Sequence, residues 1–155
     1  MTSGVRLAVD VGSVRVGVAA CDPGGLLATP VATLRRDLDG RGDIETIATL
    51  VTDLGAVEVI VGLPRSLSGK EGPAATAARL YAGQVADRVA PVPVRLVDER
   101  LSTVSATRAL GESGVRGRER RAVIDQQAAV TFLQAALDAA SSGVILGEIV
   151  DPTDG

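Results

Sequence analysis

The sequence contains no histidine and a single cysteine, Cys21, in 155 residues. Without histidine there is no imidazole to act as a general base or to bind a metal, so Ser-His-Asp and Cys-His catalytic sites are excluded. One cysteine cannot form an intrachain disulfide or a zinc site built from several thiolates. If the protein is an enzyme, carboxylates, hydroxyl groups and arginines must carry its chemistry.

Aromatic side chains are equally scarce, because the chain has one tyrosine (Tyr81), one phenylalanine (Phe132) and no tryptophan. Two aromatic rings are too few for the stacking platforms of RNA-recognition modules and oligonucleotide-binding barrels. Hydrophobic residues make up 46% of the chain, and nearly all of them are aliphatic. This composition predicts a globular domain with an aliphatic core.

Long hydrophobic runs are missing as well. None approaches the roughly 18 uncharged residues of a membrane span, and Arg6 and Asp10 interrupt the first apolar run. We therefore expect a cytoplasmic protein that has no secretory signal and does not contact a membrane. The net charge of -3 argues against a uniformly basic surface, although every basic residue except Lys70 is arginine, which suits bidentate phosphate contacts.

The residue pattern predicts a single domain over residues 1–143 and a loosely ordered C-terminal tail over residues 144–155. The fold class is α/β, with a mixed five-stranded sheet in which an antiparallel three-strand meander is followed by parallel strands, and with helices on both faces. This order is typical of the ribonuclease H-like fold and is also compatible with other α/β sandwiches. Strands are predicted over 5–11, 14–21, 26–34, 57–61 and 94–97, and helices over 43–54, 73–89, 102–110 and 119–141.

Three carboxylates stand at informative places in this pattern. Asp10 interrupts an apolar strand, where aspartate is disfavoured. Glu99 follows the strand over 94–97, and Asp125 precedes Ala129 by four residues at the head of the apolar stripe of the last helix. Carboxylates from three elements can converge on hard divalent cations such as Mg²⁺ or Mn²⁺. Two such cations would support phosphodiester hydrolysis.

Each carboxylate also has a purely structural interpretation. Asp10 could pair with Arg6 or Arg15, since a buried carboxylate must be paired, protonated or bound to metal. Asp125 could simply favour the start of its helix through the helix dipole. Glu99 could be solvated at the end of its strand.

Four motifs resemble those of the YqgF/RuvX family, bacterial ribonuclease H-like proteins described as Holliday junction resolvases and as pre-16S rRNA nucleases. Residues 10–19 resemble the opening D-x-G-x-x-R-x-G-V-A of this family, and residues 61–64 resemble its V-G-L-P turn. Residues 98–103 resemble D-E-R-L-[ST]-T, and residues 125–129 resemble D-x-x-A-A. Each motif alone is weakly specific, whereas four in the family's order with the correct spacing are strongly specific.

The resemblance implies a catalytic and metal-binding set of Asp10, Glu99 and Asp125 with Mg²⁺ or Mn²⁺ as the cofactor. Asp98 is adjacent to Glu99, so which of the two reaches the metal stays open, and the family motif favours Glu99. The implied activity is a divalent-metal-dependent endonuclease for structured nucleic acid that acts in 5′-end maturation of 16S rRNA. The alternatives are a Holliday junction resolvase in DNA recombination and a non-catalytic nucleic-acid-binding assembly module.

The expected partner is nucleic acid, either precursor rRNA or branched DNA. Cleavage of a four-way junction would need two active sites and hence a homodimer, whereas rRNA processing could proceed on a monomer. No nucleotide cofactor is expected, because actin-like ATPases that share the Asp-x-Gly opening need a second domain, and the sequence has no Walker motif. The candidate phosphate contacts are basic residues that could equally be solvated or paired with carboxylates: Arg15, Arg65, Lys70, Arg100, Arg116 and Arg118.

Overall fold

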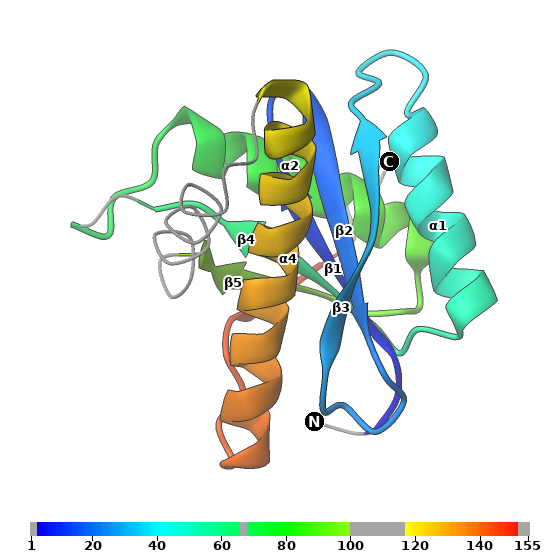
Figure 1. Ribbon diagram of the computed structural model, residues 1–155, viewed down its shortest axis with the longest axis vertical. Coiled ribbons are helices and arrows are strands. Elements are labelled where there is room, and N and C mark those ends of the chain that lie inside the picture. The colour runs from blue at the N-terminus through cyan, green and yellow to red at the C-terminus, as the bar shows by residue number, and fades with distance from the viewer. Residues whose placement is uncertain (1–2, 66–67, 100–116, 152–155) are drawn as a thin grey trace.

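A computed structural model describes residues 3–65, 68–99 and 117–151, with the side chains of 117–125 outside the description. It contains a six-stranded sheet in the order β3-β2-β1-β4-β5-β6 and three helices in the described ranges (Figure 1). The strands are β1 (Arg6–Val11), β2 (Arg15–Cys21), β3 (Ala28–Arg35), β4 (Glu58–Leu63), β5 (Val94–Asp98) and β6 (Glu148–Val150), and the helices are α1 (Gly42–Leu54), α2 (Pro73–Val89) and α4 (Gly117–Ser141).

The sheet is mixed, as predicted. Strands β1, β2 and β3 form the antiparallel meander, and β4 and β5 continue the sheet parallel to β1. The predicted number of five strands is one too low, because β6 pairs antiparallel with the outer edge of β5. This strand comes from the segment after residue 143, which the residue pattern marks as loosely ordered. It is three residues long and largely exposed, so it has no alternation from which a strand could be recognised.

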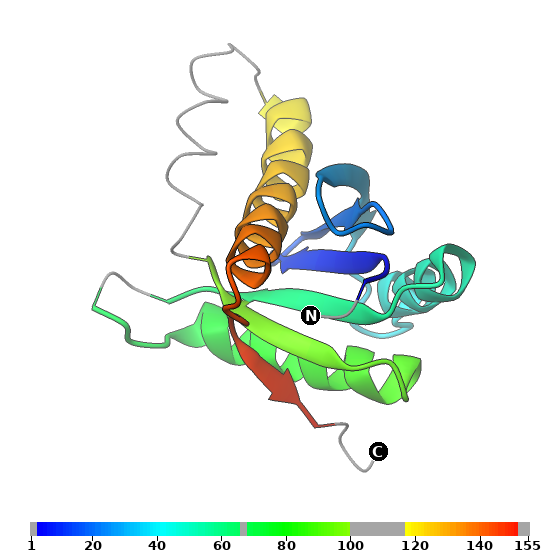
Figure 2. The same ribbon diagram turned by 90° about the horizontal axis from the view of Figure 1, so that it is seen from below.

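Helices cover both faces of the sheet (Figures 1 and 2). On one face, α1 and α2 bury the side chains of Leu7 and Val9 of β1 with those of Val59 and Val61 of β4. The other face is covered by α4, and Ala8 lies in that second core. Consecutive residues of a strand point to opposite faces, which explains the alternation. The two aromatic residues divide between the layers, since Tyr81 is buried in the first core and Phe132 in the second.

Glutamine side chains fix α4 on the meander. The Gln134 side chain donates to the carbonyl oxygen of Leu26 and accepts from the backbone N–H of Ala28, both at 2.9 Å. Gln126 Nε2 donates to Thr33 Oγ1 at 2.8 Å. These contacts tie α4 at Gln126 and at Gln134 to β3 and its preceding turn, so the helix runs at a fixed position across the face that carries Ala8.

The predicted helices over 43–54, 73–89 and 119–141 correspond to α1, α2 and α4. The predicted helix over 102–110 lies outside the described residues. No helix within the described ranges is long and apolar enough to cross a membrane.

Candidate active site

Asp10 lies on the α4 side of the sheet. Because Ala8 of the same strand belongs to the core under α4 and side chains alternate along a strand, Asp10 points to that side as well. It pairs in register with Gly17 of β2 near the end of β1 and is partly buried. A carboxyl group is thereby placed at the end of a hydrophobic layer.

Glu99 reaches the same face from the end of β5. It follows the last residue of this strand and lies over Gly62 of β4, the strand that separates β5 from β1. A Cβ atom added to Gly62 would lie 2.8 Å from Glu99 Cγ and 2.8 Å from Phe132 Cε1, and closer still to Glu99 Oε1. The missing side chain at Gly62 is therefore what leaves room for Glu99 between β4 and α4.

Asp10 and Glu99 contact each other across β4. Burial, a hydrogen bond to Glu99 and the charge of Glu99, in that order of size, together raise the pKa of Asp10 to about 9. Two adjacent carboxylates repel when both are ionised, so one retains a proton unless a cation lies beside them. The structure thus brings together two of the three predicted acids, from elements far apart in the sequence. Arg6, a competing partner for Asp10 in the structural interpretation, pairs with Glu58 at 3.5 Å.

Asp125, the third predicted acid, belongs to α4, and its side chain lies outside the described residues. Its backbone position is seven residues before Phe132, which is about two helical turns. In the ranges whose side chains are described, no three acidic or thiol groups gather into a metal site. A site of three carboxylates would therefore need Asp125 or another residue beyond those ranges.

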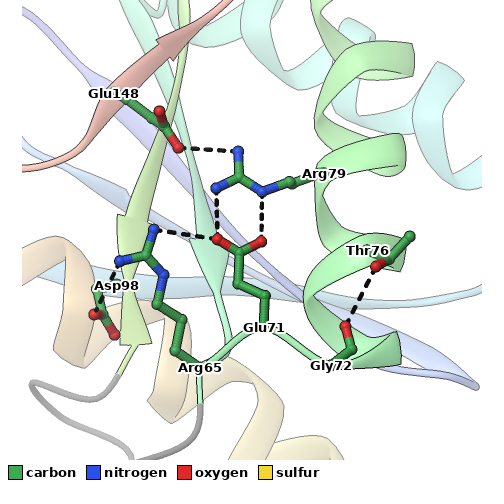
Figure 3. Close-up of polar contacts among 7 residues, drawn as sticks. All are labelled: Arg65, Glu71, Gly72, Thr76, Arg79, Asp98 and Glu148. Atoms are coloured by element: carbon green, nitrogen blue, oxygen red, sulfur yellow. Dashed lines mark hydrogen bonds and ion pairs between the residues drawn. The ribbon is translucent and has the colours of Figure 1, made fainter. Parts of the chain in front are cut away.

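A network of charged side chains reaches Asp98, the residue before Glu99 (Figure 3). Arg79 of α2 binds Glu71 through two hydrogen bonds of 2.7 Å and pairs with Glu148 of β6 at 2.9 Å. Arg65, which follows β4, reaches between Glu71 at 3.3 Å and Asp98 at 4.0 Å. The hydrogen bond from Arg79 lowers the pKa of Glu71. Arg65, one of the candidate phosphate contacts, is thus held beside the residue that precedes Glu99.

Two of the other candidate phosphate contacts lie in the described residues. Arg15 begins β2 and is partly buried, and Lys70 is exposed on the loop before α2. Arg100 and Arg116 lie outside the described residues, as does the side chain of Arg118 at the start of α4.

A family model described as RuvX, Holliday junction resolvase, matches residues 4–139. The chain belongs to the RuvX family. A relative from Frankia casuarinae is 58% identical over 145 residues, which cover 91% of this chain and 72% of the relative. A relative from a Nocardioides strain is 55% identical over 159 residues, which cover 99% of this chain and all of the relative. Both are named "Putative pre-16S rRNA nuclease".

The fold of this RuvX family member is also found in solved structures. Thermus thermophilus RuvC in complex with a Holliday junction substrate is similar with a TM-score of 0.54 and 16% sequence identity, over 93% of this chain and 99% of that one. A second structure of Thermus thermophilus RuvC gives a TM-score of 0.50. At this level of identity the likeness concerns the fold alone, and it confirms the predicted ribonuclease H-like class.

Two structural features of the RuvX site were not predicted from the sequence. One is the role of Gly62, for which the signal is a glycine inside a strand of β-branched residues, a pattern typical of a close approach by another group. The other is Arg36, which donates to the carbonyl oxygen of Gly12 at 2.8 Å and lies 5.1 Å from the centre of the Tyr81 ring. Arg36 thereby fixes the turn that follows Asp10, and nothing in its local sequence indicates this contact.

Proposed function

We propose that this RuvX family member is a divalent-metal-dependent endonuclease that cleaves precursor 16S rRNA during maturation of its 5′ end, a step of ribosome biogenesis. The observation that carries the proposal is the contact between Asp10 and Glu99 on the α4 face of the sheet. The names of the relatives that are 55% to 58% identical support rRNA as the substrate. The domain over residues 1–143 would be the catalytic unit, acting in the cytoplasm.

The donor set fits a hard cation. Asp10 and Glu99 offer only carboxylate oxygens, which are the ligands of Mg²⁺ and Mn²⁺. Because the two carboxyl groups lie close together, Asp10 keeps a proton in the metal-free protein. A bound cation would replace this proton and offset the repulsion between the two negative charges. Asp10, Glu99 and Asp125 would hold the metal. When bound, such cations polarise the scissile phosphate and lower the pKa of the attacking water.

The chain's own residues prepare this site. Asp10 must lose its proton when a cation binds, so the site is acid-sensitive. The missing side chain at Gly62 leaves room for Glu99 on the face of the sheet, and Phe132 borders the same space, so the position of Glu99 is restricted on two sides. Arg36 fixes the turn after Asp10 through the Gly12 carbonyl group. These contacts orient the two acids without help from the substrate.

Arginine side chains would bind the phosphate groups of the substrate. Arg65 supports this role best, because its guanidinium lies 4.0 Å from Asp98 and its side chain is 30% exposed. Glu71 and Asp98 neutralise it in the free protein, and a phosphate could replace its contact with Glu71. The remaining candidates for this role are Arg15, Lys70, Arg100, Arg116 and Arg118.

Cleavage of branched DNA is the second candidate function, because the matching family model is described as a Holliday junction resolvase. Resolution of a junction needs two active sites, so this function would require a homodimer. The name shared by the relatives favours the rRNA substrate.

One experiment separates these possibilities. Purified protein is offered precursor 16S rRNA and a four-way DNA junction, with and without Mn²⁺, beside the variants Asp10→Asn and Asp53→Asn. Asp53 is an exposed aspartate in the last turn of α1, on the opposite side of the sheet, and is a matched control. We expect Mn²⁺-dependent cleavage of the rRNA, a loss of at least 100-fold with Asp10→Asn, and full activity with Asp53→Asn. Equal cleavage by Asp10→Asn would exclude the proposed site, and cleavage of the junction alone would favour the second function.

A further inference from the structure

A cavity of about 260 Å³ lies at the ends of β4 and β5 and borders β6. Its apolar wall includes Leu63, Leu96 and Val97, which are fixed in the sheet and at most 3% exposed, together with Leu146 from the connection between α4 and β6. The cavity is therefore a preformed hollow with a rigid base. Asp98, the residue before Glu99 in the sequence, also lines it.

Three charged side chains converge on this cavity: Arg65, Asp98 and Glu148. Figure 3 shows how they are held, with Arg65 between Glu71 and Asp98 and with Glu148 on Arg79. Arg65 Nε is buried and has no hydrogen-bond partner among the described residues. The cavity thus combines a planar cation that has a spare donor with two carboxylates that can only accept hydrogen bonds.

We propose that this cavity binds one unpaired nucleobase of the nucleic acid substrate. The inference rests on the proposed nuclease function and adds a feature of the substrate to it. Proteins that read unpaired nucleotides place the base between apolar or aromatic side chains and arginine guanidinium planes and bind its edge through hydrogen bonds. Here Leu96 and Leu146 would contact the base, and Arg65 would provide the guanidinium group.

The size and charge of the cavity favour a base over other ligands. Pockets for complete small ligands have volumes of about 300 to 1,000 Å³, so 260 Å³ suits a single heterocycle better than a whole nucleotide. A phosphate group alone would meet Asp98 and Glu148, which repel it. An amino group on a base would instead donate to these carboxylates, as cytosine N4 does to acidic side chains in other complexes.

The position of the cavity gives the base a role in cleavage. Asp98 lines the cavity and Glu99 is the next residue along the chain, so we expect a phosphate next to a base held there to reach across the end of β5 toward the acids. The protein would then cut beside an unpaired nucleotide. It would prefer cytosine, adenine or guanine at that position over uracil, which has carbonyl groups and no amino group.

The test measures nucleotide binding in the absence of metal. Cytidine 5′-monophosphate, uridine 5′-monophosphate and ribose 5-phosphate are titrated into the ¹⁵N-labelled protein, and the backbone amide signals are followed. We expect the cytidine nucleotide to shift the signals of Val97, Gly147 and Glu148 and to bind about tenfold more tightly than the uridine nucleotide. Ribose 5-phosphate should leave these signals unchanged. Equal shifts with ribose 5-phosphate would overturn the proposal, because the cavity would then bind phosphate alone.

Two variants test the cavity itself. Glu148→Gln removes one acceptor and should weaken cytidine nucleotide binding about tenfold. Its matched control is Glu45→Gln, which breaks a similar exposed pair with Arg88 on the other side of α2 and should leave binding unchanged. Leu146→Trp should fill the cavity and abolish binding. If Glu148→Gln and Glu45→Gln bind the cytidine nucleotide equally, the proposal is wrong.

Nucleotide binding at the cavity and cleavage of nucleic acid can succeed or fail independently. Cleavage of rRNA without cytidine-induced shifts at the cavity would refute the base site and leave the nuclease intact. Shifts at the cavity in a protein that cleaves no nucleic acid would uphold the base site and refute the nuclease.

Discussion

Replacing Gly62 with alanine tests whether the contact between Asp10 and Glu99 depends on the empty space over β4. In the middle of a strand, alanine is preferred over glycine by about 0.5 to 1 kcal/mol. If Gly62 had no special role, the variant would be slightly more stable than the wild type. The structure predicts the opposite, because the added methyl group would meet Glu99 and Phe132.

The size of the effect follows from the contact distances. The new Cβ would lie 2.8 Å from Glu99 Cγ and from Phe132 Cε1, whereas ordinary contacts lie at 3.4 to 4 Å. The two side chains must therefore move by about 0.6 to 1.2 Å. Overpacking of this kind costs about 1 to 3 kcal/mol. A catalytic group displaced by about 1 Å loses about 100-fold in rate.

Urea denaturation and initial rates of rRNA cleavage measure both effects. We expect Gly62→Ala to lower the free energy of unfolding by about 1 to 3 kcal/mol and kcat by about 100-fold. Gly72→Ala is the control for kcat, because no atom of the described residues lies within 4 Å of its added Cβ and its φ of -106° is open to alanine. A Gly62→Ala protein with wild-type stability and wild-type kcat would refute the packing argument.

Further predictions concern three other contacts. Tyr81→Phe should cost about 1 to 3 kcal/mol in urea denaturation, because it removes the 2.9 Å hydrogen bond to the buried Asp43; an unchanged midpoint would contradict this. The raised pKa of Asp10 means that the folded protein binds more protons than the unfolded chain between about pH 4 and 9, so metal-free protein should lose stability as pH rises. Asp10→Asn should show a smaller loss over the same pH range. Glu71→Gln should remove a carboxylate that competes with the substrate phosphate for Arg65 and should lower KM more than it changes kcat, and an unaltered KM would argue against the phosphate contact of Arg65.

Much of the fold follows from residue patterns. The apolar run of β1, which is buried on both faces, and the apolar stripe of α4 are recognisable in the sequence, so strands and helices are predicted close to their observed bounds. Strand β6 could not be predicted in this way, because it is defined by its backbone pairing with β5 and not by a pattern of buried side chains. A short edge strand of this kind is set by its tertiary neighbour.

The candidate site is only partly visible in the sequence. An aspartate inside an apolar strand indicates that Asp10 needs a partner, but the choice between Arg6, Arg15 and Glu99 depends on which side chains the sheet brings together. The order of the strands selects Glu99. Strand β4 lies between β1 and β5, and its Gly62 has no side chain that would separate Asp10 from Glu99. The pairing of Arg65 with Glu71 likewise depends on the loop between β4 and α2, whose conformation no local pattern specifies.

Calorimetric titration of Mn²⁺ into the protein at pH 7 tests the central claim most directly. The account predicts binding by the wild type with proton release, seen as a dependence of the heat on the ionisation enthalpy of the buffer, because Asp10 must lose its proton. Asp53→Asn should behave as the wild type does, and Asp10→Asn and Glu99→Gln should bind at least tenfold more weakly. Equal affinity of Asp10→Asn and the wild type for Mn²⁺ would contradict the assignment of these acids as the metal site.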